Sequence, residues 1–433
     1  MLEEIYSRFR ECRGITTDSR KCGPGLMFFA LKGEHFDGND FVSGALDKGC
    51  SYAVMDRDSI YNPLDKRMIL VDDVLRTLQQ LASYHRIKMG PKVIGITGTN
   101  GKTTTKEFTN AVMSTTYNVL CTQGNLNNSI GVPVTILGLN PEHEYAVVEM
   151  GASHPGDIRE LVDICQPDCG LITNVGKAHL LGFGSFEGVK RTKGELYDWL
   201  REHEGIAFVN RDNEHLQRMC SGMRIVEYGK PGQSGLLVEG EVMECNPFVK
   251  FRWRSRGGKW HIVQTSLVGA YNVDNALAAI TVGLYSGVSE ECASRAVAEY
   301  VPQNNRSQLV ETECNHLVVD AYNANPTSME MAIENFSMIK AQDKMLILGD
   351  MLELGDASRD EHLRILNLLK NKGFSSVWLV GREFGEAGKE SGFRIFASVD
   401  EVNRELEMKK LKGKTILIKG SNGIGLTKTL NYL

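Results

Sequence analysis

Short apolar runs alternate with amphipathic segments along most of the chain. Between residues 89 and 303 the runs KVIGIT, YAVVEM, CGLITNV and GIAFVN are typical of buried strands. The intervening segments GDIRELVDIC and TKGELYDWLREH have the apolar spacing of helices. Strands that alternate with helices in this way form parallel sheets with crossover helices. The pattern therefore predicts an α/β fold, whose central part has the layout of a nucleotide-binding domain.

Two interruptions in the pattern predict three domains. The first follows the helix-like segment VLRTLQQLASYHRIKM, which ends at the helix-stopping pair Gly90-Pro91. After residue 302 the alternation restarts, and the apolar runs in HLVVDAYNANP, KMLILGDMLELG, SSVWLVG and KTILIKGSNG each end in a loop containing Gly, Asn or Asp. A chain of 433 residues also exceeds what one hydrophobic core usually supports. We expect a small α/β domain at 1–88, a central parallel-sheet domain at 89–303 and a Rossmann-like domain at 304–433.

One segment of the central part, residues 235–268, has a different pattern. Two strand candidates lie on either side of Gly257-Gly258. Strand candidates joined by a Gly-Gly turn are typical of a β-hairpin. We therefore expect this segment to form a hairpin that decorates the central sheet.

Composition and charge narrow the classes of function. Apolar residues make up 42% of the chain and charged residues 24%, which is ordinary for a globular protein and unlike a disordered or fibrous chain. The formal net charge of -5 leaves no broad basic surface for nucleic acid or for anionic lipid. We expect no nucleic-acid partner, and any anion must be held at a local site.

The sequence also indicates the cellular compartment of the protein. The N-terminal MLEEIYSRFRECRG contains acidic residues and no apolar run, unlike a signal peptide, and no stretch is long and apolar enough to span a bilayer. Ten scattered cysteines in so long a chain indicate reduced thiols. The close pair Cys165 and Cys169 lacks the second pair that is typical of a zinc site. We expect a cytoplasmic protein without membrane insertion.

The strongest chemical signal is VIGITGTNGKTTTKEF at residues 93–108, a strand followed by a glycine-rich turn and a helix-compatible run. Backbone N–H groups in such a turn, together with the helix N-terminus, bind anionic oxygens. Gly98 and Gly101 let the main chain approach closely, Lys102 supplies a positive charge for the β- and γ-phosphates, and the Thr103 hydroxyl can ligate Mg²⁺. The loop lacks the first glycine of a standard Walker A motif. It favours ATP binding over the alternative of a plain strand-to-helix turn with a surface lysine.

From this loop onward the sequence resembles the Mur ligase family, and the resemblance covers nearly the whole chain. The family's short phosphate loop, G-T/S-x-G-K-T/S, is present at residues 98–103. The segments TQGNLNNSIGVPVTIL (122–137), VVEMGASHPGDI (147–158), TNVGKAHL (173–180) and TKGEL (192–196) follow in the order expected of the family's central domain. The resemblance implies a central P-loop ATPase domain, a C-terminal Rossmann-like domain, and an ATP-dependent ligase that forms an amide bond.

Two segments in the third domain, DAYNANPTSMEMAI (320–333) and LGDMLELG (348–355), resemble the members of the family that add D-alanyl-D-alanine to UDP-N-acetylmuramoyl-tripeptide. The D-N-P-R motif expected of members that add a diamino acid is absent. The N-terminal TDSRKCGPGLMFFALKGEHFDGNDF is similar to the family's module for the UDP end of the substrate. The resemblance thus implies a monomeric enzyme of peptidoglycan precursor synthesis. In the implied reaction ATP converts a terminal carboxylate to an acyl phosphate, which the amine of the dipeptide attacks.

The resemblance also implies roles for side chains near the phosphate loop. Glu149 would ligate one Mg²⁺ and His179 a second Mg²⁺, and Lys193 corresponds to a lysine that several members carry as a carbamate, an anion that can bind Mg²⁺. From the residues alone, a strand-end glutamate, a loop histidine and a helix-face lysine are more often solvated or structural, so these alternatives stay open. The predicted catalytic residues are Lys102, Glu149, His179 and Lys193, and the predicted metal ligands are Thr103, Glu149, His179 and, if carbamylated, Lys193.

The remaining predicted contacts belong to the nucleotide and the substrates. Asn275 resembles the family's adenine contact, with helix-start chemistry as the competing explanation. Arg306 would reach the transferring phosphoryl group and Asp320 a ribose hydroxyl once the third domain closes. The predicted nucleotide-binding residues are Gly98, Thr99, Asn100, Gly101, Lys102, Thr103, Thr104, Asn275, Arg306 and Asp320. The predicted substrate-binding residues are Ser19, Arg20, Thr122, Asn125, Asn127, Asn128, Tyr322, Asn323 and Asn325, for several of which turn formation is the alternative.

Three positions depart from the family's usual pattern. HLLGFGS (179–185) lacks the carboxylate of the usual HLE-x-FGS. Tyr271 stands where a histidine commonly precedes the asparagine of the adenine segment, and an aromatic ring can still stack there. Asn422 stands where an arginine is common, which removes the natural bidentate partner of an acceptor carboxylate.

Other functions are compatible with part of this pattern. A ligase of the same superfamily that extends folate with glutamate, as folylpolyglutamate synthase does, would share the phosphate loop, but the YNANP and LGDMLELG segments argue against it. A P-loop regulatory ATPase would hydrolyse ATP slowly without making a bond. The predicted catalytic residues argue against a catalytically inactive paralogue, because all of them are intact.

Overall fold

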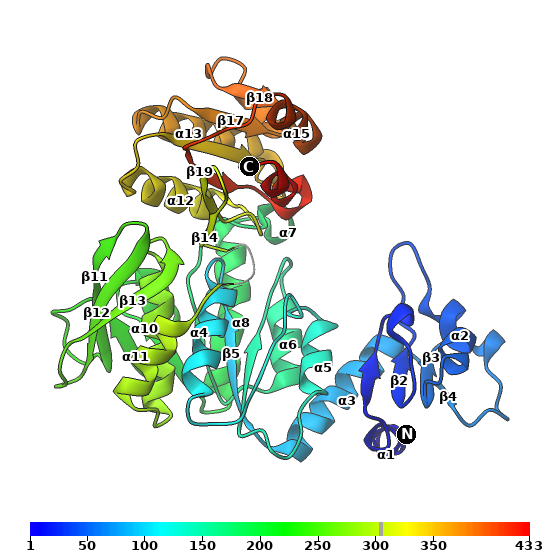
Figure 1. Cartoon of the computed structure of the whole chain (residues 1–433). Helices are drawn as coiled ribbons and strands as arrows, with labels where there is room; N and C mark the ends of the chain where they lie inside the picture. The colour runs from blue at the N-terminus through cyan, green and yellow to red at the C-terminus, as the bar shows by residue number, and fades with distance from the viewer. Residues whose placement is uncertain (303–305) are drawn as a thin grey trace.

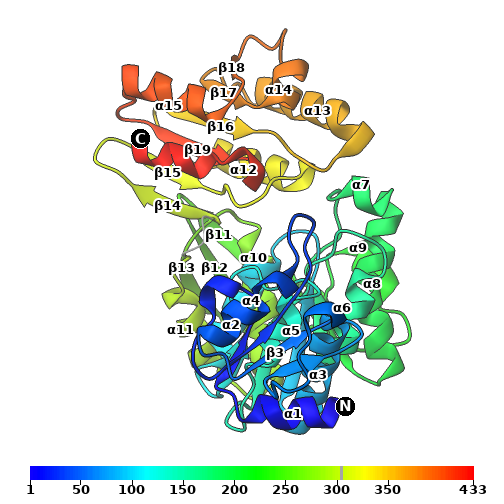
Figure 2. The same cartoon turned by 90° about the vertical axis from the view of Figure 1, so that its right-hand side faces the viewer.

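Figures 1 and 2 show the computed structural model of the chain, which describes residues 1–302 and 306–433. Within these residues the strands form three sheets, of four, nine and six strands, that follow one another along the chain. The predicted three-domain α/β architecture is confirmed. The predicted boundary between residues 303 and 304 lies outside the described residues, and the boundary after residue 88 stays a prediction.

The N-terminal domain contains an all-parallel sheet with the strand order β1-β2-β3-β4. Its strands are β1 (Gly14–Thr16), β2 (Leu26–Phe29), β3 (Tyr52–Met55) and β4 (Met68–Leu70). Its helices are α1 (Leu2–Arg10), α2 (Val42–Asp47), α3 (Val74–Met89) and the 3₁₀ turns η1 (Ser19–Lys21), η2 (Gly38–Phe41) and η3 (Asp58–Ile60).

Helix α3 joins the N-terminal domain to the central domain, as Figure 1 shows. The Asp73 carboxylate caps its first turn by accepting the Arg76 N–H, and Gly90, with a φ of 69°, ends it as the sequence predicts. Leu78 and Leu81 of α3 are fully buried, in a hydrophobic core that they share with the central domain. Removing this apolar surface from water therefore holds the two domains together.

The central domain is built on the longest sheet, with the order β13-β12-β11-β10-β9-β8-β5-β7-β6. Its strands are β5 (Lys92–Thr97), β6 (Val119–Cys121), β7 (Tyr145–Glu149), β8 (Cys169–Ile172), β9 (Ile206–Asn210), β10 (Arg224–Gly229), β11 (Val238–Cys245), β12 (Phe248–Ser255) and β13 (His261–Val268). Its helices are α4 (Lys102–Met113), α5 (Gly131–Ile136), α6 (Asp157–Cys165), α7 (Leu180–Phe183), α8 (Phe186–Glu202), α9 (Glu214–Met219), α10 (Asn272–Tyr285) and α11 (Glu290–Glu299).

Both faces of this sheet are covered by helices, as expected of a parallel sheet. One face packs against α3, α5, α6 and α8, through buried residues such as Ile158 and Leu196. The other face packs against α4, α10 and α11, through residues such as Phe108 and Leu277. Because both faces are buried, the strands from β5 to β9 are almost continuously apolar, which is the pattern seen in the sequence.

The predicted hairpin with its Gly257-Gly258 turn is confirmed for β12 and β13, which pair antiparallel and extend the central sheet, but the segment at residues 235–268 also contains a further strand, β11. The segment forms three strands, because a turn at Asn246-Pro247 separates β11 from β12, and the predicted Gly257-Gly258 turn separates β12 from β13. Strand β11 pairs in parallel with β10, so the segment extends the central sheet by hydrogen bonding. The Asn246-Pro247 pair is itself a turn signal, so the boundary between β11 and β12 could be predicted from the sequence.

The C-terminal domain is a doubly wound sheet with the order β14-β15-β19-β16-β17-β18, in which only the edge pair β14 and β15 is antiparallel among the described strands. Its strands are β14 (Gln308–Glu311), β15 (His316–Val319), β16 (Lys344–Gly349), β17 (Val377–Val380), β18 (Arg394–Phe396) and β19 (Thr415–Lys419). Its helices are α12 (Pro326–Met338), α13 (Ser358–Asn371), α14 (Arg382–Ala387), α15 (Val399–Met408), and the 3₁₀ helices η4 (Gly355–Ala357), η5 (Asn422–Ile424) and η6 (Leu426–Tyr432).

The C-terminal domain lies over the end of the central domain that carries α7, as both views show (Figures 1 and 2). Strands β5, β7 and β8 finish at one edge of the central sheet, since Ile96 is in register with Glu149 and Thr97 with Ile172. In open parallel sheets, ligands bind outside the carboxyl ends of the strands. The described helices include none long and apolar enough to cross a membrane.

Candidate active site

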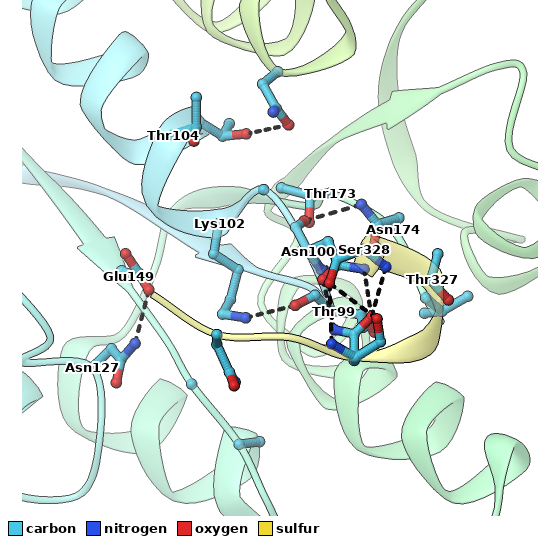
Figure 3. Close-up of a pocket in the computed structure, with 18 of the residues that line it drawn as sticks. Thr99, Asn100, Lys102, Thr104, Asn127, Glu149, Thr173, Asn174, Thr327 and Ser328 are labelled. Carbon is cyan, nitrogen blue, oxygen red and sulfur yellow. Dashed lines mark hydrogen bonds between the residues drawn. The ribbon is translucent and has the colours of Figure 1, made fainter. Parts of the chain in front are cut away.

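A cavity of about 630 Å³ lies between the carboxyl edge of the central sheet and the C-terminal domain. Figure 3 shows how its residues converge from both domains. The predicted site residues that line it are Thr99, Asn100, Gly101, Lys102, Thr104, Asn127, Asn128, Glu149, His179, Asn275, Arg306, Asp320, Tyr322, Asn323 and Asn325. The structure thus brings most of the predicted residues, from distant parts of the chain, to one cavity.

The phosphate loop connects β5 to α4, and its glycines stand where a side chain would collide. A Cβ on Gly98, which has a φ of 142°, would lie 2.0 Å from Thr173 Oγ1. A Cβ on Gly101, which has a φ of 81°, would lie 2.5 Å from Asn275 Oδ1. Glycine is therefore required at both positions by backbone conformation and by space.

The turn that follows β8 braces the phosphate loop. The Asn174 Oδ1 atom accepts the Asn100 N–H at 3.0 Å, and the Asn174 carbonyl accepts the Thr99 N–H at 2.9 Å. The Thr173 hydroxyl donates to the Asn100 carbonyl oxygen at 2.6 Å. These bonds fix the loop, so its remaining N–H groups and the start of α4 can bind an anion without reorganisation.

Lys102 begins α4 and folds back over the loop. Its Nζ donates to the carbonyl oxygens of Gly98 and Thr99 at 2.8 and 3.0 Å (Figure 3). Burial lowers the pKa of Lys102 to about 8, against an opposing effect of Glu149. The two carbonyl groups are neutral, so a phosphate group would give this ammonium group a negatively charged partner. The phosphate would compete with the two carbonyl groups for the N–H donors of Lys102.

Glu149 ends β7 and is 1% exposed. Its Oε1 accepts hydrogen bonds from Asn127 Nδ2 at 2.8 Å and from Thr103 Oγ1 at 3.1 Å. Among the described residues nothing pairs with its buried Oε2. An unpaired buried carboxylate oxygen beside a phosphate loop and a threonine hydroxyl fits Mg²⁺, which prefers one or two carboxylates together with phosphate oxygens.

Within the described residues no group of three His, Cys, Asp or Glu side chains is arranged to hold a metal ion. Such a group is the usual sign of a metal site made by the protein alone. A magnesium ion at Glu149 would instead depend on the nucleotide for several of its ligands.

In two further predicted site residues, Lys193 and His179, the pKa is affected by burial and by the charge of Lys102, and in Lys193 also by the charge of Glu149. Burial lowers the pKa of Lys193 well below that of an ordinary lysine, and the charge of Lys102 adds to the effect. Lys193 is 2% exposed, on α8, and its Nζ lies 5.7 Å from the centre of the Phe183 ring. Burial also lowers the pKa of His179. The expectation that Lys193 is a solvated helix-face lysine is therefore contradicted by its burial.

Asn275 lies in the first turn of α10 and is 7% exposed. Its Nδ2 donates to Asn272 Oδ1 at 3.0 Å, and its Oδ1 accepts from Thr105 Oγ1 at 3.0 Å. Neither bond caps α10, whose N-cap residue makes no side-chain cap, so the helix-start explanation is not supported, and the bond from Thr105 instead ties α10 to α4. The same amide borders the cavity, next to the phosphate loop.

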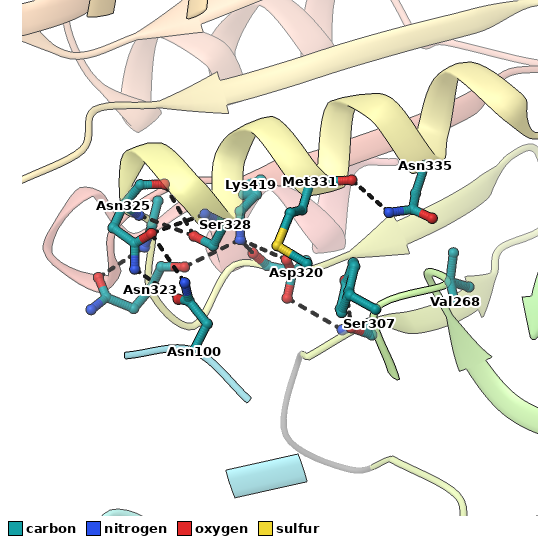
Figure 4. A network of polar contacts seen from close by, with 12 residues as sticks. Asn100, Val268, Ser307, Asp320, Asn323, Asn325, Ser328, Met331, Asn335 and Lys419 are labelled. Atoms are coloured by element: carbon teal, nitrogen blue, oxygen red, sulfur yellow. Dashed lines mark hydrogen bonds and ion pairs between the residues drawn. The ribbon is translucent and has the colours of Figure 1, made fainter. Parts of the chain in front are cut away.

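The C-terminal domain contributes three charged groups to the cavity, on Arg306, Asp320 and Lys419. The Arg306 guanidinium lies over the Tyr322 ring, 3.7 Å from its centre. The Asp320 carboxylate is bound to Lys419 Nζ at 2.6 Å and accepts the Ser307 N–H at 3.3 Å (Figure 4). Lys419 is 1% exposed and therefore holds Asp320 in a fixed position.

Asn325 links the two domains directly. Its Nδ2 donates to Asn100 Oδ1 at 2.7 Å, and Asn100 Nδ2 donates back to Asn325 Oδ1 at 3.4 Å (Figures 3 and 4). The same Oδ1 accepts the Ser328 N–H and so caps α12, with Pro326 in its first turn. The amide pair therefore joins the phosphate loop to the segment predicted to bind the acceptor dipeptide.

The amide pair predicts a measurable coupling between the domains. Asn325→Ser keeps a good helix cap but removes the bond to Asn100, and Asn100→Ala removes it from the other side. Each change is expected to lower kcat/KM for the acceptor by about fivefold, and the double variant no further, a coupling of about 1 kcal/mol. Steady-state kinetics of the four proteins test this, and losses that multiply in the double variant would contradict it.

Several predicted residues do not line the cavity. Ser19 and Arg20 lie in η1 of the N-terminal domain, where Arg20 pairs with Asp18 at 2.9 Å. Thr122 is fully buried, and its hydroxyl accepts the Glu149 N–H at 3.0 Å, so it supports the carboxylate instead of facing a substrate. Gly98, Thr103, Asn125 and Lys193 also lie outside the lining, Thr103 with a bond to Glu149.

Sequence reasoning missed Thr173, Asn174, Lys419 and Thr327 as residues of the cavity. The motif TNVGKAHL contains the first two, but His179 is its only predicted site residue. Lys419 stands at the start of KGSNGIGL, from which no site residue is predicted. A lysine at the end of an apolar strand is an available signal, because a buried charge needs a partner.

The chain matches three family domains in order. The domain described as "Mur ligase family, catalytic domain" covers residues 11–86, "Mur ligase middle domain" covers 96–283, and "Mur ligase, glutamate ligase domain" covers 305–422. Among curated proteins, the UDP-N-acetylmuramoyl-tripeptide--D-alanyl-D-alanine ligase of Bacillus subtilis (strain 168) is 36% identical over 431 residues, which is 97% of this chain and 93% of the relative.

Solved structures show similarity to the same family. MurF from Acinetobacter baumannii has a TM-score of 0.87 at 30% identity, and the match covers 100% of this chain and 98% of that one. MurF ligase from Thermotoga maritima in complex with ADP has a TM-score of 0.86 at 27% identity, with 97% and 96% of the chains covered. The similarity thus extends over all three domains.

Proposed function

The chain belongs to the Mur ligase family, and on that premise we propose that it joins D-alanyl-D-alanine to UDP-N-acetylmuramoyl-tripeptide at the expense of ATP. One observation of the structure carries the proposal. The phosphate loop and the YNANP segment, 225 residues apart, border one cavity and are joined by the Asn100–Asn325 amide pair. A triphosphate bound at the loop and an acceptor bound at the YNANP segment would thus be adjacent, as a ligase requires.

In the proposed reaction the chain's own residues bind, orient and exclude water. The phosphate loop and Lys102 hold the triphosphate of ATP, and the use of this nucleotide is supported by the relative that was solved in complex with ADP. The terminal carboxylate of the tripeptide attacks the γ-phosphorus, and ADP leaves. The acceptor amine then attacks the carbonyl carbon of the acyl phosphate, loses a proton, and expels inorganic phosphate. Phosphoryl transfer of this kind depends on positioning and charge neutralisation more than on a protein nucleophile.

We assign one Mg²⁺ to Glu149 and Thr103 and a second Mg²⁺ to His179, with a carbamylated Lys193 as a further ligand. The unpaired Glu149 Oε2 supports the first assignment. When bound, the ions would neutralise charge on the phosphate oxygens. Asn127 holds the other carboxylate oxygen and thereby orients Glu149.

The C-terminal residues would close over the nucleotide. Arg306, stacked on Tyr322, brings a positive charge to the cavity from the C-terminal domain. Asp320, held by Lys419, offers a carboxylate to a ribose hydroxyl. A closed cavity protects an acyl phosphate from water.

Ser19 and Arg20 would bind the UDP end in the N-terminal domain, and Asn128, Asn323 and Asn325 the peptide parts. The monomeric state and the cytoplasmic location stay predictions.

The lowered pKa of Lys193 predicts that its amine reacts with CO₂. Only the neutral amine forms a carbamate, with release of a proton, so a pKa depressed by burial favours the reaction at neutral pH. Protein equilibrated with ¹³C-bicarbonate is expected to show a carbamate carbon by NMR that is absent from Lys193→Ala. We also expect activity to fall about tenfold after CO₂ is removed and to return with bicarbonate. Full activity without CO₂ would contradict the assignment.

The proposed function is tested by phosphate release with the two substrates offered singly and together. Release is expected only when UDP-N-acetylmuramoyl-tripeptide and D-alanyl-D-alanine are both present, with a product whose mass is their sum less one water. Release that ignores both substrates would indicate a regulatory ATPase. Release with a folate and glutamate would indicate a ligase like folylpolyglutamate synthase.

A further inference from the structure

The central and C-terminal domains meet at a second contact, between the turn before α7 and the LGDMLELG segment after β16. His179 Nδ1 lies 2.6 Å from Glu353 Oε2, and the Leu181 N–H donates to the Glu353 carbonyl oxygen at 3.3 Å. Beside them, Lys177 forms an ion pair of 2.7 Å with Glu361, whose side chain is 7% exposed. Both views place α7 at the end of the central domain that faces the C-terminal domain (Figures 1 and 2). We refer to these five residues as the α7 contact.

The backbone at the α7 contact is unusual on both sides. His179 has a φ of 50° and Glu353 a φ of 65°, in the left-handed region that residues with a Cβ rarely adopt. Such a conformation costs free energy and persists only where the surroundings hold it. Two turns with this conformation therefore direct these side chains toward each other across the domain boundary.

The contact with Glu353 involves only one of the two ring nitrogens of His179. His179 borders the active-site cavity, whereas Glu353 does not. The carboxylate approaches Nδ1, which leaves Nε2 as the nitrogen available to the cavity. The approach is oblique, since Nδ1 makes no aligned hydrogen bond within the described residues, and the Glu353 side chain is 56% exposed. An exposed pair of this kind contributes little to stability. We therefore expect the pair to affect the orientation of the His179 ring more than the stability of the protein.

We propose that Glu353 is a positioning residue, which holds the His179 ring with Nε2 toward the metal side of the cavity while the C-terminal domain is closed. This inference rests on the proposed function, in which His179 is a ligand of Mg²⁺. A histidine that binds a metal commonly donates its other ring N–H to a carboxylate, which sets the tautomer and the orientation of the ring. Here the carboxylate comes from another domain, so the metal site is complete only when the domains are closed.

Glu353→Gln tests the proposal, because it keeps the size of the side chain and removes its charge. In the complex with ADP, the affinity for Mn²⁺ measured by electron paramagnetic resonance is expected to fall about tenfold, and kcat by a similar factor. The KM for ATP should change little, since the phosphate loop is intact. Glu361→Gln is the matched control. It weakens the neighbouring ion pair between the domains but leaves the carboxylate at His179, so Mn²⁺ affinity should be retained.

A third variant makes the outcome specific to the histidine. In a His179→Asn background, Glu353→Gln should cause no further loss of Mn²⁺ affinity, and the thermal unfolding midpoint reports whether each variant is folded. Unchanged Mn²⁺ affinity in Glu353→Gln, or an equal loss in Glu361→Gln, would overturn the proposal. A wild-type protein that binds Mn²⁺ yet forms no product would instead contradict the proposed function, so the two failures are distinguishable.

Discussion

Replacing Lys102 with alanine is expected to lower the rate of ligation on the order of 10³-fold, the largest effect predicted for any single substitution here. Lys102 Nζ is the charged group closest to the loop carbonyls of Gly98 and Thr99, and the developing charge on the phosphate oxygens would lose its main fixed counter-charge. Phosphate release with both substrates present measures the effect. Lys92→Ala, at the exposed opposite end of β5, is the control and should retain activity.

The pH dependence of ATP binding provides a second check on Lys102. Its pKa in the nucleotide-free protein is lowered to about 8, so its positive charge is present below that pH and is lost as the pH rises through it. Binding of an anion should therefore weaken above about pH 8, and the weakening should be missing in Lys102→Ala. Equal pH profiles for the two proteins, measured by calorimetry, would contradict the assignment of Lys102 to the phosphates.

Glu149→Gln is expected to reduce ligation on the order of 10²-fold while leaving the fold intact. Glutamine keeps an oxygen that can accept from Asn127 and Thr103, as Oε1 of Glu149 does, but it lacks the negative charge that Mg²⁺ requires. The Mg²⁺ concentration needed for half-maximal activity should rise in the same variant. Glu142→Gln, at an exposed position before the same strand, is the control. A variant with normal activity and normal Mg²⁺ dependence would exclude Glu149 as the ligand.

The phosphate loop could be predicted from the sequence because all of its determinants are contiguous. The apolar strand, the glycines and the helix-compatible run follow one another, and β5 ends at Thr97 while α4 begins at Lys102. Helix α3 was predictable for the same reason, since its apolar spacing and Gly90 define it locally. Local signals of this kind survive in the structure because tertiary packing agrees with them.

Contacts between distant segments could not be predicted from periodicity or composition. The Asn100–Asn325 pair joins residues 225 apart, and Lys419 reaches Asp320 across 99 residues because β15 and β19 are neighbours in the sheet. Strand order is set by the packing of the whole domain, so neither partner is visible in the other's local sequence. The family resemblance named most of these residues but not their hydrogen bonds.

Thr122 shows where polarity alone misleads. A threonine followed by asparagines was read as a substrate contact, but it directly follows β6 and is buried against β7. A hydroxyl at a strand end can accept a backbone N–H as readily as it can bind a ligand, and here it accepts that of Glu149. Whether such a hydroxyl accepts a backbone N–H or binds a ligand depends on the neighbouring strand.

The position of the triphosphate tests the central claim most directly. In a crystal structure with a non-hydrolysable ATP analogue and Mg²⁺, we expect the β- and γ-phosphates at the N–H groups of residues 98–104, within reach of Lys102, and the base beside Asn275. Phosphates bound in another part of the cavity, away from this loop, would contradict the account.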